Sequence, residues 1–182
     1  SGQVAAIRAI PSHDQAKPRT IDARRPTSIF LDQSRYDLEQ AKVFQRFAVP
    51  VAVSALVASP GSAVGLDVYG KALLLTRDKA GVARVFLNTC THKGSKLVED
   101  CESRKTNKVT CPYHAWTFGL DGALVGVPRE ETIASFDKKD RGLVELASKE
   151  AGGLIWAMLD RNATPNFESV DAAMVADFDA LD

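Results

Sequence analysis

Two short segments carry residues that could bind a metal. One reads Cys-Thr-His at residues 90–92, and the other reads Cys-Pro-Tyr-His at residues 111–114. The chain has only three histidines and three cysteines, so most of these residues lie in the two segments. Thiolate and imidazole groups are good ligands for soft and borderline metal ions. We therefore expect one metal site whose ligands come from both segments: Cys90, His92, Cys111 and His114.

Two kinds of metal centre fit two cysteines and two histidines. One is a tetrahedral zinc ion, and the other is a [2Fe-2S] cluster in which two histidines replace two cysteines on one iron. Structural zinc sites usually group like ligands, whereas here each segment supplies one cysteine and one histidine. This alternation favours the cluster, with a thiolate from each loop on the inner iron and an imidazole from each loop on the outer iron. A zinc-stapled binding domain without redox function is the alternative.

The sequence around these ligands is typical of short β-strands. Residues 85–87 precede the first cysteine and Lys108–Thr110 precedes the second, so a sheet could hold both loops side by side. Turn sequences at residues 78–81 and 119–122 are typical of hairpin loops. Further strands are predicted at residues 51–53, 72–76, 82–87, 115–118 and 123–125, and residues 143–146 and 153–159 are predicted as a pair that closes the domain. We expect a mainly β fold of antiparallel sheets.

Helical patterns flank the predicted strands. Ser34 can cap a helix that ends before Pro50, with an apolar face of Leu38, Ala41, Phe44 and Phe47. A second helical pattern begins near the end of the chain, at Val170, Met174, Val175 and Phe178.

The first residues show neither helical nor strand periodicity. Residues 1–33 carry several prolines and basic side chains, which predicts a flexible arm, and His13 within it is expected to be exposed rather than metal-bound. We therefore divide the chain into an arm at 1–33, a β domain at 34–165 and the start of a missing neighbouring domain at 166–182.

The motifs around the metal ligands resemble the Rieske iron-sulfur proteins, most closely the N-terminal Rieske domain of ring-hydroxylating (aromatic) oxygenase α subunits. Residues 90–97, Cys-Thr-His-Lys-Gly-Ser-Lys-Leu, are similar to the family pattern Cys-x-His-Arg-Gly-x-x-Leu, and residues 111–118 fit Cys-x-Tyr-His-x-Trp-x-Phe. The resemblance covers about residues 36–165. It implies a Rieske fold with two cluster-binding loops, preceded by a short helix. It also implies the [2Fe-2S] ligands Cys90, His92, Cys111 and His114.

Some positions depart from the family pattern. Lys93 stands where the family more often has arginine, which keeps the charge but loses the planar hydrogen-bonding fork. Respiratory Rieske proteins carry two further cysteines that form a disulfide, whereas Ser95 and Tyr113 stand at those places here. We therefore expect a reduction potential toward the low end of the Rieske range, roughly −150 mV. Cys101 lies in a charged excursion and is expected to be exposed and unpaired.

The resemblance implies one-electron transfer. A ferredoxin or reductase would reduce the cluster, and the electron would then pass to a mononuclear Fe(II). In the family, this transfer crosses a trimer interface between neighbouring α subunits. Such an iron is held by two histidines and one carboxylate, and only His13 remains beside the cluster ligands, so this chain cannot supply that site. We expect the electron-transfer module of a Rieske non-heme iron oxygenase, either a dioxygenase or a monooxygenase. A stand-alone Rieske ferredoxin is the alternative, which the long arm and the helical pattern after Pro165 disfavour.

The charge and hydropathy of the sequence limit the classes of partner that we expect for the chain. The chain has 23 basic and 23 acidic side chains, so no overall positive charge favours nucleic acid or a membrane surface. The apolar stretch at residues 47–57 is too short to span a membrane, and no secretory signal begins the sequence, so we expect a cytoplasmic chain. Four basic side chains could form a docking patch for an acidic electron donor or simply a solvated rim: Lys93, Lys96, Lys105 and Lys108. Trp116 and Phe118 are expected to form a hydrophobic lid and core beside the second loop.

Overall fold

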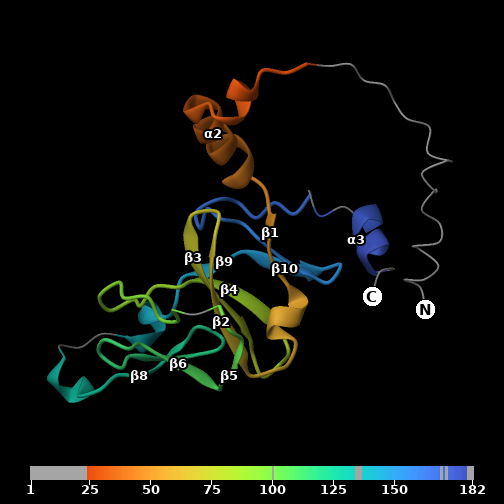
Figure 1. Ribbon diagram of the computed structural model, residues 1–182. Helices are drawn as coiled ribbons and strands as arrows, with labels where there is room; N and C mark the ends of the chain where they lie inside the picture. Colours follow the sequence, from red (N-terminus) through yellow and green to blue (C-terminus); the bar gives the residue numbers. More distant parts are fainter. Residues whose placement is uncertain (1–23, 100, 134–136, 169, 171, 180–182) are drawn as a thin grey trace.

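The computed structural model describes residues 24–99, 101–133, 137–168, 170 and 172–179 (Figure 1). Within these residues the strands form three antiparallel sheets, which confirms the predicted mainly β class. His13 and the rest of residues 1–23 lie outside the described residues. None of the described helices is long and apolar enough to cross a membrane.

The central sheet has the strand order β5-β2-β3-β4-β9. Its strands are β2 (Ser62–Val68), β3 (Lys71–Arg77), β4 (Ala83–Leu87), β5 (Arg104–Lys105) and β9 (Glu145–Leu146). The strands predicted at residues 72–76 and 82–87 are confirmed as β3 and β4, but β2 was not predicted. The first half of β2 is buried on both faces, so its sequence lacks the alternation that marks a half-buried strand.

A second sheet has the order β1-β11-β10 and contains β1 (Val49–Val53), β10 (Ser148–Ala151) and β11 (Leu154–Ala157). β1 includes Pro50, which is tolerated because β1 is an edge strand with a register irregularity after this residue. The predicted pairing of residues 143–146 with 153–159 is wrong. β9 pairs with β4, whereas β11 pairs with β1 and β10, so the two runs lie in different sheets.

The third sheet is a small antiparallel unit of β6 (Lys108–Thr110), β7 (Thr117–Gly119) and β8 (Leu124–Gly126). The hairpin predicted around residues 119–122 is confirmed, because β7 and β8 pair across this turn. Gly122 in the turn has a φ of +84°, and a Cβ there would lie 2.5 Å from the Phe86 ring. Its carbonyl accepts a hydrogen bond of 2.8 Å from the Leu143 N–H. The turn therefore needs glycine both for its conformation and for its close packing on β4.

The central sheet is covered on both faces. Leu73 and Leu75 of β3 pack toward the β1-β11-β10 sheet, in a cluster that includes Ile155. Leu74 points to the opposite face and joins the cluster of the small β6-β7-β8 sheet, which includes Phe118. Because neighbouring side chains of a strand point to opposite faces, β3 contributes to both cores.

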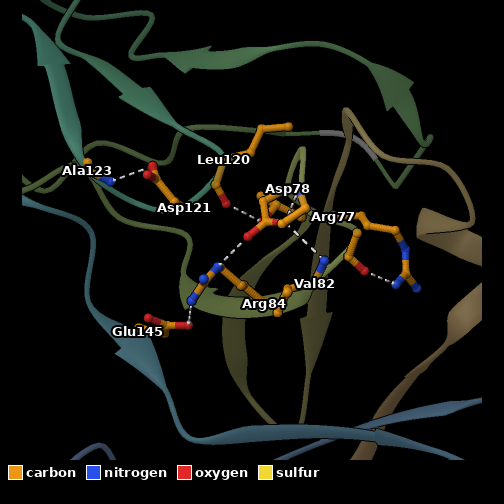
Figure 2. A network of polar contacts seen from close by, with 11 residues as sticks. Arg77, Asp78, Val82, Arg84, Leu120, Asp121, Ala123 and Glu145 are labelled. Carbon is orange, nitrogen blue, oxygen red and sulfur yellow. Dashed lines mark hydrogen bonds and ion pairs between the residues drawn. The ribbon is translucent and has the colours of Figure 1, made fainter.

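A network of charged side chains fixes the turn between β3 and β4 (Figure 2). The Oδ1 atom of Asp78 accepts hydrogen bonds of 2.9 Å from the N–H groups of Ala80 and Val82. Its Oδ2 atom accepts a 3.0 Å bond from Arg84, which donates a second bond of 2.9 Å to Glu145 of β9. The network therefore ties the hairpin turn to the edge strand of the same sheet.

The N-terminal helix differs from its prediction in two respects. It consists of α2 (Gln33–Glu39) followed by a π-helical turn, η2 (Gln40–Phe44), and ends before Pro50 as predicted. Its cap is Asp32 rather than Ser34, because the Asp32 carboxylate accepts the N–H groups of Ser34 and Arg35. The predicted apolar face is not buried as a stripe, since Leu38 is 57% and Phe47 is 37% exposed. Phe44 is half-buried and packs on the Tyr69 ring and on the core cluster of the central sheet.

Short helical turns complete the described chain. η1 (Thr27–Phe30) follows Pro26 inside the predicted arm, and none of its residues is buried. Other turns are η3 (Ser54–Val57), η4 (Glu130–Thr132) and η5 (Lys138–Arg141). The predicted C-terminal helix is confirmed as α3 (Ala172–Asp179), and Val170 before it packs with Trp156 and Met158.

Candidate metal centre

The first candidate loop leaves β4 and folds into a tight turn. The Cys90 N–H donates to the Ser95 carbonyl at 2.8 Å, and the Gly94 N–H donates to the Cys90 carbonyl at 2.9 Å. Gly94 has a φ of +77°, a conformation that glycine adopts without steric cost. The turn buries Cys90, which is 3% exposed.

The second loop repeats this turn between β6 and β7. The Cys111 N–H donates to the Trp116 carbonyl at 2.8 Å, and the Ala115 N–H donates to the Cys111 carbonyl at 3.0 Å. Ala115 takes the place of Gly94, with a φ of +56°, although its side chain disfavours that conformation. Cys111 is also 3% exposed. The two loops thus present their cysteines from the same backbone geometry.

The two thiols meet between the loops. Cys90 and Cys111 lie close enough for their side chains to interact. Burial raises the pKa of the Cys90 thiol. Burial also opposes ionisation of Cys111, but the N–H groups of Tyr113 and His114 and the contact with Cys90 lower the pKa of this thiol. Each thiol therefore accepts backbone N–H groups of its own loop, which favour negative charge on sulfur and act against the effect of burial.

The two imidazoles form a second pair. The ring centroids of His92 and His114 lie 4.7 Å apart with an interplanar angle of 70°. His92 is half-buried and stacks on Trp116, with centroids 4.7 Å apart and an angle of 6°. His114 is exposed and lies against Tyr113, at a centroid distance of 3.7 Å. The His92 imidazole is thus partly covered by Trp116, whereas the His114 imidazole is exposed at the surface.

An unsatisfied nitrogen marks the position of a ligand. The Nδ1 atom of His92 is buried and has no hydrogen-bond partner among the described residues. Burial, followed by the nearby His114 and Lys93, lowers the pKa of His92, which favours the neutral form of the ring that can bind a metal ion. A buried nitrogen without a partner is costly, and coordination of a metal ion would remove that cost.

The four side chains form two pairs rather than one converging group. One pair is made by the thiols Cys90 and Cys111, and the other by the imidazoles His92 and His114. A thiol pair beside an imidazole pair suits a cluster with two irons, one bound by cysteines and one by histidines.

Comparison with known proteins identifies the family. A model of the Rieske [2Fe-2S] domain matches residues 47–137. The chain belongs to this family. Its cofactor is therefore the Rieske [2Fe-2S] cluster, which agrees with the donor set of the two loops and with the orphaned nitrogen of His92. The Rieske fold implied by the sequence motifs is also confirmed.

The relatives of this chain include monooxygenases from bacteria and plants. The oxygenase subunit of carnitine monooxygenase from Escherichia coli is 34% identical over 76% of this chain and 37% of its own length. The chloroplastic choline monooxygenase of Amaranthus tricolor is 31% identical over 90% of this chain and 36% of its length. A Rieske domain of oxygenase subunits is thus common to this chain and to these proteins.

Solved structures of oxygenases also match the fold of this chain. A quaternary ammonium Rieske monooxygenase in complex with an inhibitor matches with a TM-score of 0.73 and 30% identity, over 85% of this chain and 42% of that one. Naphthalene 1,2-dioxygenase matches with a TM-score of 0.65 and 31% identity, over 74% and 30%. The chain spans well under half of the length of each of these oxygenases.

The structure also places the residues that were predicted to lie around the metal ligands. Trp116 and Phe118 are buried beside the second loop, as predicted, and Cys101 is exposed and free. Lys96 of the predicted basic patch forms an ion pair with Asp67 at 2.9 Å. The stacking of Trp116 on His92 was not predicted, although the Cys-x-Tyr-His-x-Trp spacing placed this ring close to the ligands.

Proposed function

We propose that Cys90 and Cys111 bind the inner iron of the Rieske cluster and that His92 and His114 bind the outer iron. The single observation that carries this assignment is the arrangement of two matched turns, which bring one thiol pair and one imidazole pair together. The free Nδ1 of His92 supports it further.

We further propose that the chain is the electron-transfer module of a Rieske non-heme iron oxygenase. When bound, the cluster takes up and releases one electron. The protein contributes an asymmetric environment for this step. Trp116 and Phe118 are buried and exclude water from the loops, while His114 and Tyr113 remain exposed where another protein can approach.

The activity and partners of the whole protein follow as proposals from its relatives. Residues 34–165 would form the Rieske domain, between an arm at 1–33 and the start of a catalytic domain at 166–182. That domain would hold a mononuclear Fe(II). A ferredoxin or reductase would supply electrons, and a neighbouring α subunit in a trimer would receive them. One related structure is described by its inter-subunit electron transfer, which supports this arrangement.

We also propose a cytoplasmic location, because the chain has only three cysteines and their spacing suits metal binding rather than a disulfide framework.

Metal analysis and spectroscopy of the anaerobically purified chain test the proposal. About two irons and two sulfides per chain are expected, with a rhombic paramagnetic resonance signal that appears when dithionite adds one electron. One zinc ion per colourless chain would contradict the proposal and would support a binding domain without redox function.

A further inference from the structure

Asn88 lies immediately after β4, at the start of the first loop, and is 1% exposed. Its Oδ1 atom accepts hydrogen bonds of 3.1 Å from the N–H groups of both Leu97 and Val98. Its Nδ2 atom donates a bond of 2.7 Å to the Val98 carbonyl. One side chain thus joins the two ends of the loop that carries Cys90 and His92.

The second loop needs no such side chain. Its two ends are the paired strands β6 and β7, in which Thr110 lies opposite Thr117. In the first loop, only the entry is a strand, because Leu97 and Val98 lie outside any strand. The carboxamide of Asn88 offers a carbonyl acceptor and N–H donors on one plane, like a peptide group. The Asn88 side chain therefore supplies to residues 97–98 the hydrogen bonds that a paired strand would otherwise supply.

Loss of the Asn88 side chain would disturb the loop that carries Cys90 and His92. Leu97 and Val98 are 7% and 4% exposed, so their backbone groups have no ready access to water. Both residues belong to the same core cluster as Cys90 and Cys111. The Asn88 N–H also donates to the Ala72 carbonyl at 2.9 Å, which anchors the loop to the central sheet.

We propose that Asn88 is a positioning residue, which closes the first loop so that Cys90 and His92 face Cys111 and His114. The proposal rests on the cluster ligands proposed above, since Asn88 would act on the cluster only through them. The closure of the loop can be measured without the cluster.

Hydrogen exchange of the full chain tests the closure. Asn88→Ala is expected to raise the exchange rate of peptides spanning residues 95–99 by about tenfold, because the Leu97 and Val98 amides lose their acceptor. Ser62→Ala is the matched control. Ser62 is 6% exposed, is the first residue of β2, and donates a hydrogen bond of 2.6 Å from its hydroxyl to the Ser59 carbonyl. Loss of this hydroxyl should leave the exchange of residues 95–99 unchanged.

Two readouts connect the closure to the cluster. In holoprotein, Asn88→Ala is expected to lose iron to a chelator about tenfold faster and to give a broadened paramagnetic resonance signal, while Ser62→Ala keeps the rate and signal of the unchanged chain. Unchanged exchange, iron loss and signal in Asn88→Ala, or equal changes in Ser62→Ala, would overturn the proposal.

The unchanged chain provides a test that does not require a folded variant. The Leu97 and Val98 amides should exchange more slowly than the amide of the exposed residue Glu99, and equal exchange would refute the closure. If no cluster binds to any form of the chain, the proposed function fails, yet the exchange measurements still decide whether Asn88 closes the loop.

Discussion

At the residue scale, the four proposed ligands have distinct roles. Cys90→Ala or Cys111→Ala is expected to abolish cluster binding, because each removes a thiolate from the buried pair. His92→Cys or His114→Cys is expected to keep a cluster of lower potential, since a thiolate replaces a neutral imidazole. Iron content and redox titration measure both results. A spectrally normal cluster in Cys111→Ala would exclude this residue as a ligand.

Ala115 carries local strain that can be removed. Its φ of +56° stands where the matching turn has glycine. Ala115→Gly is expected to stabilise the chain by about 0.5 kcal/mol, as the steric cost of a left-handed alanine exceeds the added entropy of glycine in the unfolded chain.

Ala123→Gly is the matched control, because Ala123 is exposed and its φ is not positive. This substitution should destabilise the chain by about 0.5 kcal/mol. Chemical denaturation measures both variants, and equal destabilisation by the two would show that the turn at Ala115 is unstrained.

At the element scale, one ion pair links the central sheet to its neighbour. Arg77 of β3 is 9% exposed and forms hydrogen bonds of 3.0 and 2.6 Å to the two carboxylate oxygens of Glu150 in β10. The Arg77 guanidinium holds the pKa of Glu150 below its ordinary value of 4.5. A lowered carboxylate pKa stabilises the folded state above the ordinary pKa and loses this effect as the pH falls.

Stability should therefore fall with acid in a way that depends on Glu150. Thermal unfolding of the unchanged chain is expected to shift to lower temperature from about pH 5 to about pH 3. Glu150→Gln should be less stable near neutral pH and should show a shallower fall with acid, because its amide does not titrate. Parallel pH curves for the two proteins would mean that this pair contributes nothing to acid sensitivity.

The elements also show what a sequence can predict. β3 and β4 were found because apolar side chains cluster between clear turn sequences, and the metal ligands were found because four rare residues share two short segments. β2 was missed because its first half is buried on both faces and so shows no alternation of apolar and polar residues. Asn88 was missed because its partners lie nine and ten residues away and carry only backbone groups. Contacts of this kind leave no periodic signal.

At the scale of the whole molecule, the balanced total charge leaves docking to local side chains. Lys93 is exposed and follows His92 directly, whereas Lys149 is exposed on β10 in another sheet. Lys93→Glu is expected to slow reduction by an acidic ferredoxin several-fold at low salt, and Lys149→Glu is expected to have little effect. Stopped-flow reduction at several salt concentrations measures this. Rates that do not depend on salt in any of these proteins would argue against charge-guided docking.

The central claim is that two imidazoles and two thiols of this chain hold one Rieske cluster. Pulsed paramagnetic resonance of the reduced chain, grown with histidine labelled with heavy nitrogen, tests it most directly. Two histidine nitrogens coupled to the reduced cluster are predicted, and His92→Cys or His114→Cys should each leave one. A cluster without coupled histidine nitrogens, or a coupling that both variants retain in full, would contradict the proposed ligand set.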